Sequence, residues 1–416
     1  MPYRICLISL GCAKNQVNSE QMLYLLNQAG HEVVGEVDGC DVAIVNTCGF
    51  IDSAKSEAID QILQLAEVKK AGGLKKILVT GCLSQRYEND ILESLPEVDG
   101  MLGTGSFGQI CQAVEDVMHG GKPLYFGDKS GPIEEIGRVV TTGPGWAYLR
   151  IAEGCDNWCA FCAIPAIRGR YRSRTLDAIV QEAKDLADLG VKELIVIAQD
   201  ITRWGMDLYG RPSLARLLRE LAKIDGIRWI RLHYLYPEII DDELIDLIAN
   251  EDKIVKYLDI PIQHINNDIL RRMNRHCTGD EIRALLQRLN REKGITVVLS
   301  SHNLPELEQL ATEYAFLRQG RLMEQVSAEQ LQARCADCID IAVSDAERYL
   351  VLLERELHHE RYQVLPDGTV RIFDPQLEAE AYSRLAGEQG MGVSRLERRR
   401  TSLEQYYFEL KEKGAA

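Results

Sequence analysis

Cys155, Cys159 and Cys162 follow one another closely in the middle of the chain. The spacing C-x3-C-x2-C places three thiols on one loop, directly after a predicted strand. Three thiolates suit a [4Fe–4S] cluster with one iron left open for a cofactor, because a fourth thiolate would close it. A zinc site is a weaker alternative, since zinc prefers four ligands in paired C-x2-C elements. Three unrelated buried thiols are the other alternative.

Three further cysteines, Cys12, Cys48 and Cys82, are 36 and 34 residues apart. Each follows the carboxyl end of a predicted strand. Because the carboxyl ends of parallel strands meet at one edge of a sheet, where ligands bind, we expect these thiols to converge. A second [4Fe–4S] cluster with an open iron is the favoured interpretation. Small buried residues that fill strand-end turns are the alternative.

The other six of the twelve cysteines form weaker patterns. Cys335 and Cys338 form a C-x2-C with no partner pair nearby, which only weakly suggests zinc or redox chemistry. The first apolar stretch is too short for a secretion signal, so disulfides explain the cysteines less well than metal or cluster binding. Four cysteines are expected to be core or incidental thiols: Cys6, Cys40, Cys111 and Cys277.

Two α/β regions are expected to position the cysteines. In residues 1–135, strands over 4–10, 41–46 and 76–80 alternate with helices over 18–29 and 53–69. Such alternation implies a parallel sheet with right-handed crossovers. Gly81 and Gly11 precede two of the cysteines and allow close backbone approach there. A stretch with several glycines, residues 127–145, is expected to be a linker.

Residues 136–292 repeat the alternation and predict part of a (β/α) barrel. Four arginines at alternate positions, residues 168–174, either meet an anionic ligand or form a solvated basic face. The expected strands cover 147–152, 193–198, 229–232 and 257–260, and the expected helices cover 175–189, 213–224, 241–250 and 280–292.

The sequence changes character after about residue 293. One more strand is expected over 295–300, then a helix over 305–311 and a strand–Gly–Arg–strand hairpin. The fold class predicted for the whole chain is α/β. It comprises a parallel-sheet N-terminal domain, an incomplete barrel and a small mixed α/β tail over 293–416.

Composition excludes some classes of protein. The 416 residues are 46% hydrophobic and carry a net charge of −15, which argues against a surface that grips nucleic acid throughout. No apolar run approaches the ~20 residues of a membrane helix. We therefore predict a cytoplasmic protein with no membrane partner.

With two cysteine motifs in this order, residues 1 to about 292 resemble the methylthiotransferase family of radical S-adenosylmethionine (SAM) enzymes. The resemblance is strongest to the branch that modifies an aspartate of the twelfth protein of the small ribosomal subunit. The relatives that modify adenosine in tRNA are the alternative. They resemble this chain less, because their second cysteine is not usually followed by Gly-Phe-Ile-Asp-Ser. The matching stretches are SLGCAKNQVNSE, NTCGFIDSAK, VTGCLSQRY, YLRIAEGCDNWCAFCAIPAIRGRYRSR, AQDITRWG, RLHYLYP and YLDIPIQH.

The resemblance implies two [4Fe–4S] clusters, one for each cysteine set, and SAM. One SAM supplies the methyl group, and another is cleaved to a 5′-deoxyadenosyl radical. Gln199 and Gln263 follow predicted barrel strands, so we expect them to hold one face of SAM at that rim. The implied partners are the ribosomal protein, an electron donor and a sulfur source. No side chain is singled out as catalytic.

The sequence departs from this family after the helix that follows Asp280. The expected last barrel strands and the closing β-barrel, the TRAM domain, are not visible. Residues of about 293–345 instead resemble the C-terminal end of an ABC-type transporter ATPase, with His302 as its γ-phosphate sensor. A transporter ATP-binding subunit is thus a rival reading, but no phosphate-binding loop is present and no ATP binding is expected. The truncated barrel predicts slow, uncoupled SAM cleavage with little or no methylthiolated product.

Overall fold

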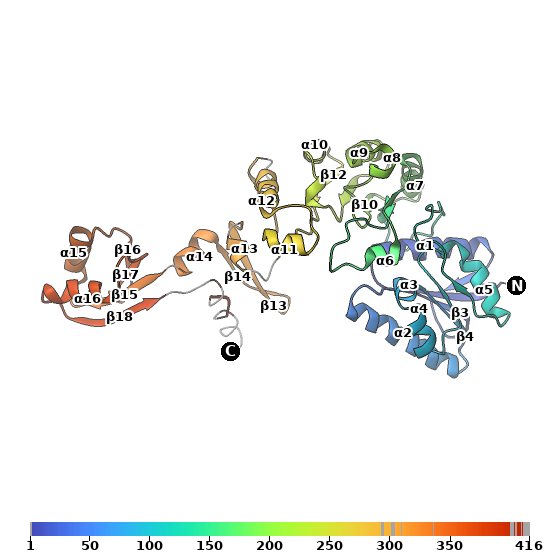
Figure 1. Cartoon of the computed structure of the whole chain (residues 1–416), viewed down its shortest axis with the longest axis horizontal. Helices are drawn as coiled ribbons and strands as arrows, with labels where there is room; N and C mark the ends of the chain where they lie inside the picture. The colour runs from blue at the N-terminus through green and yellow to red at the C-terminus, as the bar shows by residue number, and fades with distance from the viewer. Residues whose placement is uncertain are drawn as a thin grey trace. The chain divides into compact units, whose positions relative to one another are not determined.

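The computed structural model describes residues 2–292, 295–300, 304–308, 310–335, 337–399, 403, 406–408 and 410. The chain divides into two compact units, Met1–Thr296 and Val297–Ala416, and each is described by itself (Figure 1). Within the described residues, no helix has the length and apolar character needed to cross a bilayer.

The first unit opens with a parallel sheet of six strands in the order β2-β1-β3-β4-β5-β6. The predicted parallel sheet is therefore confirmed. Three short strands at its two sides, β2, β5 and β6, were not predicted from the sequence. The strands are β1 (Arg4–Ser9), β2 (Glu32–Val34), β3 (Cys40–Thr47), β4 (Leu74–Gly81), β5 (Gly100–Leu102) and β6 (Leu124–Tyr125).

Helices cover both faces of this sheet, and the two-residue period of the strands explains why. On β3, Val42 and Ile44 pack with α1 and α5, whereas Ala43 and Val45 pack with α2 and α4. Strands buried on both faces are near-continuous apolar runs, as β3 is. The helices are α1 (Ala13–Gln28), α2 (Asp52–Lys70), α3 (Cys82–Arg86), α4 (Glu88–Ser94) and α5 (Ile110–Met118).

A second parallel sheet follows, with four strands in the order β12-β11-β10-β7. Leu149, Leu194 and Ile230 are fully buried in one core with the apolar sides of α7, α9 and α10. In the described residues the sheet stays open, with no further strand to close a barrel. The elements are β7 (Trp146–Arg150), α7 (Leu176–Asp188), β10 (Glu193–Ile197), α9 (Leu214–Ala222), β11 (Trp229–Leu232), α10 (Asp242–Asn250) and β12 (Ile254–Leu258).

The other face of the second sheet is only partly covered. Tyr148, Ile195 and Arg231 form one row across three strands, and each is half-buried. On the next strand Tyr257 is 47% exposed. A closed barrel would bury this face in its interior, so the open sheet leaves it accessible.

Shorter elements complete the first unit. The prediction of a strand over 295–300 is wrong, because these residues form no strand. The Ile295 N–H donates to Leu289 O (3.0 Å), and Ile295 O accepts from the Asn290 side chain (3.0 Å), so the segment caps the preceding helix. The elements are β8 (Ala152–Glu153), α6 (Ile164–Arg168), β9 (Arg172–Ser173), α8 (Met206–Tyr209), α11 (Asn267–Arg272), α12 (Gly279–Gln287) and a π-helix, Arg288–Glu292.

The second unit contains the predicted hairpin, β13 (Glu313–Arg318) with β14 (Arg321–Ser327), flanked by α13 (Leu304–Glu308) and α14 (Ala328–Cys335). His302 lies outside the described residues. An antiparallel sheet in the order β16-β17-β15-β18 was not predicted from the sequence. Its β-α-β-β-α-β order gives the ferredoxin-like arrangement. Its elements are β15 (Cys338–Val343), α15 (Ala346–Leu357), β16 (Tyr362–Val364), β17 (Val370–Phe373), α16 (Ala379–Glu388) and β18 (Val393–Arg399).

Candidate functional site

The structure brings Cys12, Cys48 and Cys82 to one edge of the first sheet. Their strands are neighbours, and the register aligns Ser9 with Asn46 and Asn46 with Thr80. Cys12 follows the end of β1 by three residues, and Cys48 and Cys82 directly follow β3 and β4 at that shared edge. Cys82 lies in the electrostatic field of both other thiols. Strand order and register therefore gather three residues that are far apart in the sequence.

Two glycines make room for this gathering. Gly11 has a φ of +90°, and a Cβ there would lie 2.6 Å from the Cβ of Cys48. Gly81 has a φ of +101°, and a Cβ there would lie 2.5 Å from the backbone oxygen of Thr47. L side chains rarely adopt such φ values, so both turns require glycine. The close backbone approach expected at these two positions is present.

The loop with Cys155, Cys159 and Cys162 follows the short strand β8. The Cys155 N–H donates to Gly169 O (3.2 Å), and the Cys162 N–H donates to Cys159 O (2.9 Å). A Cβ on Gly154 would lie 2.0 Å from Arg170 O, so this turn also requires glycine. The loop is thus folded back on itself by its own backbone.

Side chains that the sequence analysis missed tie this loop to the rest of the unit. Asn157 donates to the Asp200 carboxylate (3.0 Å), and Asn274 donates to the backbone oxygens of Asn157 and Trp158. The Tyr236 hydroxyl lies 3.8 Å from Cys159 Sγ. The stretches AQDITRWG and RLHYLYP contain Asp200 and Tyr236, but nothing in their spacing indicated these contacts.

Both sets consist of thiols, and thiolates are the ligands that hold iron–sulfur clusters. Burial raises the pKa of Cys155 to about 12 and also raises the pKa of Cys82 and Cys162. Metal coordination removes such a proton outright. Within the described residues, no three His, Cys, Asp or Glu side chains could hold a single metal ion. A cluster spreads its thiolates over several irons, whereas zinc gathers four ligands around one ion, so the thiols fit a cluster better.

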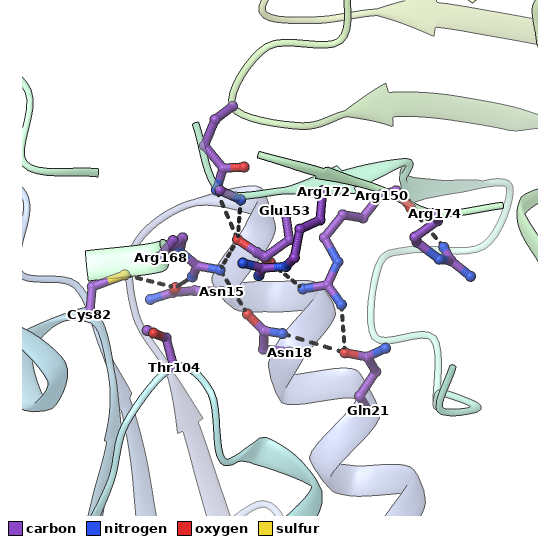
Figure 2. Close-up of polar contacts among 12 residues, drawn as sticks. Asn15, Asn18, Gln21, Cys82, Thr104, Arg150, Glu153, Arg168, Arg172 and Arg174 are labelled. Atoms are coloured by element: carbon purple, nitrogen blue, oxygen red, sulfur yellow. Dashed lines mark hydrogen bonds and ion pairs between the residues drawn. The ribbon is translucent and has the colours of Figure 1, made fainter. Parts of the chain in front are cut away.

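A buried polar seam joins the two cysteine sets (Figure 2). We use this term for Asn15, Asn18 and Gln21 of α1 together with Arg150, Glu153, Arg168 and Gln199. Arg168 is 2% exposed and donates to Asn15 Oδ1 (2.6 Å), Asn18 Oδ1 (3.3 Å) and Glu153 Oε1 (3.0 Å). Cys82 Sγ hydrogen-bonds the same Asn15 Oδ1 (3.6 Å). Arg168 therefore links the first cysteine set to the strand before the second.

Glu153 is the one negative charge of the seam. Its carboxylate accepts from Arg168, from Arg150 (2.8 Å) and from Gln199 Nε2 (3.0 Å). Burial alone would raise the pKa of Glu153, but the charges of Arg168 and Arg150 outweigh burial and lower that pKa to about 2. A buried carboxylate with two arginines is stable only because its partners are in place.

The two glutamines expected to hold SAM differ in the structure. Gln199 Oε1 is buried and has no hydrogen-bond partner among the residues that the structure describes, so this acceptor is unused. Gln263 is exposed and has a φ of +65°. Of the four arginines after the loop, Arg168 and Arg174 are buried in ion-pair networks, so the solvated-face alternative is wrong for these two.

The remaining six cysteines belong to neither set. Cys6 and Cys40 are in the core of the first sheet, Cys111 is the second residue of α5, and Cys277 is buried near α12. Cys335 ends α14 and Cys338 begins β15 in the second unit. No disulfide joins any of the twelve cysteines, all of which lie in the described part of the chain.

Two family profiles match the first unit. One is described as "Uncharacterized protein family UPF0004" and covers residues 4–103; the other is the radical SAM superfamily, over residues 149–312. The radical SAM match runs past the junction expected near residue 293, and the comparisons do not support the resemblance of the tail to an ABC-type ATPase.

Several curated proteins are about 50% identical to this chain over some 280 to 290 residues. The ribosomal protein uS12 methylthiotransferase RimO of Lachnoclostridium phytofermentans is 50% identical over 290 residues, which are 70% of this chain and 66% of that protein. RimO of Clostridioides difficile is 49% identical over 280 residues, 67% of this chain and 63% of that protein. The chain thus spans just under two thirds of the length of these relatives.

Solved structures share the fold. The radical SAM methyltransferase TsrM from Kitasatospora setae, with cobalamin and a [4Fe–4S] cluster bound, aligns with a TM-score of 0.52 at 14% identity. That alignment covers 71% of this chain and 68% of TsrM. A second TsrM structure aligns with a TM-score of 0.53 over 93% of this chain and 88% of TsrM.

Proposed function

We propose that this chain is a radical SAM methylthiotransferase that adds a methylthio group to the β-carbon of an aspartate of ribosomal protein uS12. The observation that carries the proposal is the pair of cysteine sets at the carboxyl edges of two parallel sheets, which the seam joins through Arg168. About 50% identity to proteins named uS12 methylthiotransferase supports the choice of substrate.

The proposed cofactors are two [4Fe–4S] clusters and SAM. Cys12, Cys48 and Cys82 would hold one cluster, and Cys155, Cys159 and Cys162 the other. When bound, these groups supply reductive cleavage of SAM and handling of sulfur. Gln199 offers its free buried oxygen to a donor on SAM, and Gln263 is proposed as a second contact.

The chain's own residues orient these groups and shield part of the site. The Asn157–Asp200 and Asn274 contacts fix the loop, and the seam fixes α1 against Arg150 and Glu153. We assign residues 1–135 to the methylthiotransferase N-terminal domain, 136–292 to the SAM-binding part and 293–416 to a tail without a TRAM domain. The free thiols fit a reducing compartment, the cytoplasm, where an electron donor and a sulfur source would be partners.

The test is anaerobic reconstitution, then incubation with SAM, sulfide, reductant and either uS12 or tRNA. We expect 5′-deoxyadenosine to form in excess, with a minor methylthio product on the aspartate of uS12 by mass spectrometry. A Cys155→Ala variant serves as the control and should form neither product. A methylthio product on tRNA alone, or no 5′-deoxyadenosine at all, would contradict the proposal.

A further inference from the structure

Lys14 is a nearly buried cation that the seam does not use. It follows Cys12 by two residues in the first turn of α1, and it is 7% exposed. Its Nζ lies 3.2 Å from the ring centroid of Tyr234, which follows β11 by two residues. Lys14 therefore extends from the first cysteine set to the carboxyl edge of the second sheet.

The Lys14 ammonium has no direct contact with an anionic side chain in the described part of the chain. Among the residues that the structure describes, neither an ion pair nor a hydrogen bond joins its Nζ to another side chain or to the backbone. Cys12, a proposed cluster ligand, lies within its electrostatic field, and so do Glu153 and Asp259. However, Glu153 is engaged by Arg150, Arg168 and Gln199. An ammonium has three donors, and the ring face of Tyr234 occupies one side of it.

The position of Tyr234 is itself enforced. Its φ is +66°, a conformation that costs a bulky residue roughly 1–3 kcal/mol. The Ile201 N–H donates to Tyr234 O (3.2 Å), and the next N–H, of Leu235, donates to Asp259 O (3.0 Å). His233 packs edge-on against the same ring, with centroids 5.8 Å apart. Several segments thus hold the ring where it meets Lys14.

A nearly buried cation without a counter-ion is costly, and an anionic ligand would offset that cost. The ligand would have to reach the space between the two cysteine sets, where a substrate carbon must lie if the proposed function holds. The carboxylate of SAM is expected at the open iron of its cluster, so it is not free for Lys14. The carboxylate of an acidic substrate side chain remains.

We infer that Lys14 binds the side-chain carboxylate of the substrate and so selects an acidic residue over its amide. This inference rests on the proposed function and assigns its specificity to one residue. A charge-assisted hydrogen bond of this kind corresponds to roughly tenfold to a hundredfold in affinity.

The test measures binding, so it does not depend on turnover. A fluorescently labelled fragment of uS12 with the target aspartate is compared with the same fragment carrying asparagine. For the reconstituted wild-type chain, anisotropy should show tighter binding of the aspartate fragment by roughly tenfold to a hundredfold. Lys14→Met and Lys14→Gln should bring the ratio near one, whereas Lys14→Arg should keep most of it.

Lys122→Met is the matched control, because it removes the same charge from an exposed position and should leave the ratio unchanged. Iron content checks that each variant is loaded. The assignment of Lys14 is wrong if Lys14→Met and Lys14→Gln keep the wild-type ratio of affinities for the aspartate and asparagine fragments. It is equally wrong if these variants keep that ratio but lose affinity for SAM. If the wild-type chain binds neither fragment, or binds both equally, the proposed substrate is wrong as well.

Discussion

The two parallel sheets of the first unit place cysteines at their carboxyl edges in different ways. The six-stranded sheet is covered on both faces, and strand register alone brings its three cysteines together. The four-stranded sheet is covered on one face, and its three cysteines lie on one loop that other segments tie down. Strand register thus positions the first cysteine set, whereas side-chain contacts to the loop position the second.

Helix α1 contacts both sheets. It packs against strands of the first sheet and against β7 of the second. Its polar residues Asn15, Asn18 and Gln21 form one half of the seam. Helix α1 therefore covers part of the second sheet where no further strand does, and the Arg168 hydrogen bonds to Asn15 and Asn18 hold the helix there.

The largest expected effect concerns coupling at the open sheet. Because the face with Tyr148, Ile195 and Arg231 is accessible, water reaches the site and competes with the substrate. We predict that 5′-deoxyadenosine exceeds the methylthiolated aspartate by a wide margin. Chromatography and mass spectrometry of one reaction mixture measure both. Near-equivalence of the two products would show that the open sheet is sufficiently walled.

The second-largest expected effect is the destabilisation of the first unit when the seam is broken. Arg168→Met leaves Glu153 buried with one arginine fewer, which costs about 3–5 kcal/mol of unfolding free energy. Urea unfolding of the metal-free chain, followed by circular dichroism, measures the loss. Arg170→Met is the control, since it removes the same charge from an exposed side chain and should cost within about 0.5 kcal/mol. Equal losses for the two variants would refute the role of the seam.

The smallest expected effect is the difference in unfolding free energy lost when one side chain is truncated in each sheet. Leu78 is fully buried in the first sheet, so Leu78→Ala should cost about 2–5 kcal/mol. Ile195 is half-buried on the open face, so Ile195→Ala should cost about 1 kcal/mol or less. The same unfolding measurement applies to both variants. A cost for Ile195→Ala as large as that for Leu78→Ala would mean that the open face is packed in solution.

Strand-based features of this unit were predictable because each uses one local pattern. The strand over 229–232 and the alignment of Cys12, Cys48 and Cys82 follow from apolar runs and parallel-sheet geometry. The start of α1 was predicted five residues late, at Asn18 instead of Ala13, because Asn15 and Asn18 are polar yet face inward. An apolar-period rule cannot detect polar residues buried in a seam.

Features that depend on a partner were not predictable. The β-branched run near residue 295 predicts a strand, but no strand edge pairs with it, and strand preference depends on such a neighbour. Arg168 is one of four alternating arginines, yet its partners Asn15 and Asn18 are 153 and 150 residues away. Nothing local distinguishes it from exposed Arg170.

The central claim is that each cysteine set holds one cluster. Iron and sulfide analysis, with electron paramagnetic resonance, tests this on the reconstituted chain and on two triple variants. These variants replace Cys12, Cys48 and Cys82, or Cys155, Cys159 and Cys162, with alanine. Two [4Fe–4S] clusters predict about eight irons in the wild-type chain and about four in each variant. Zinc in place of iron, or full iron in either variant, would contradict the account.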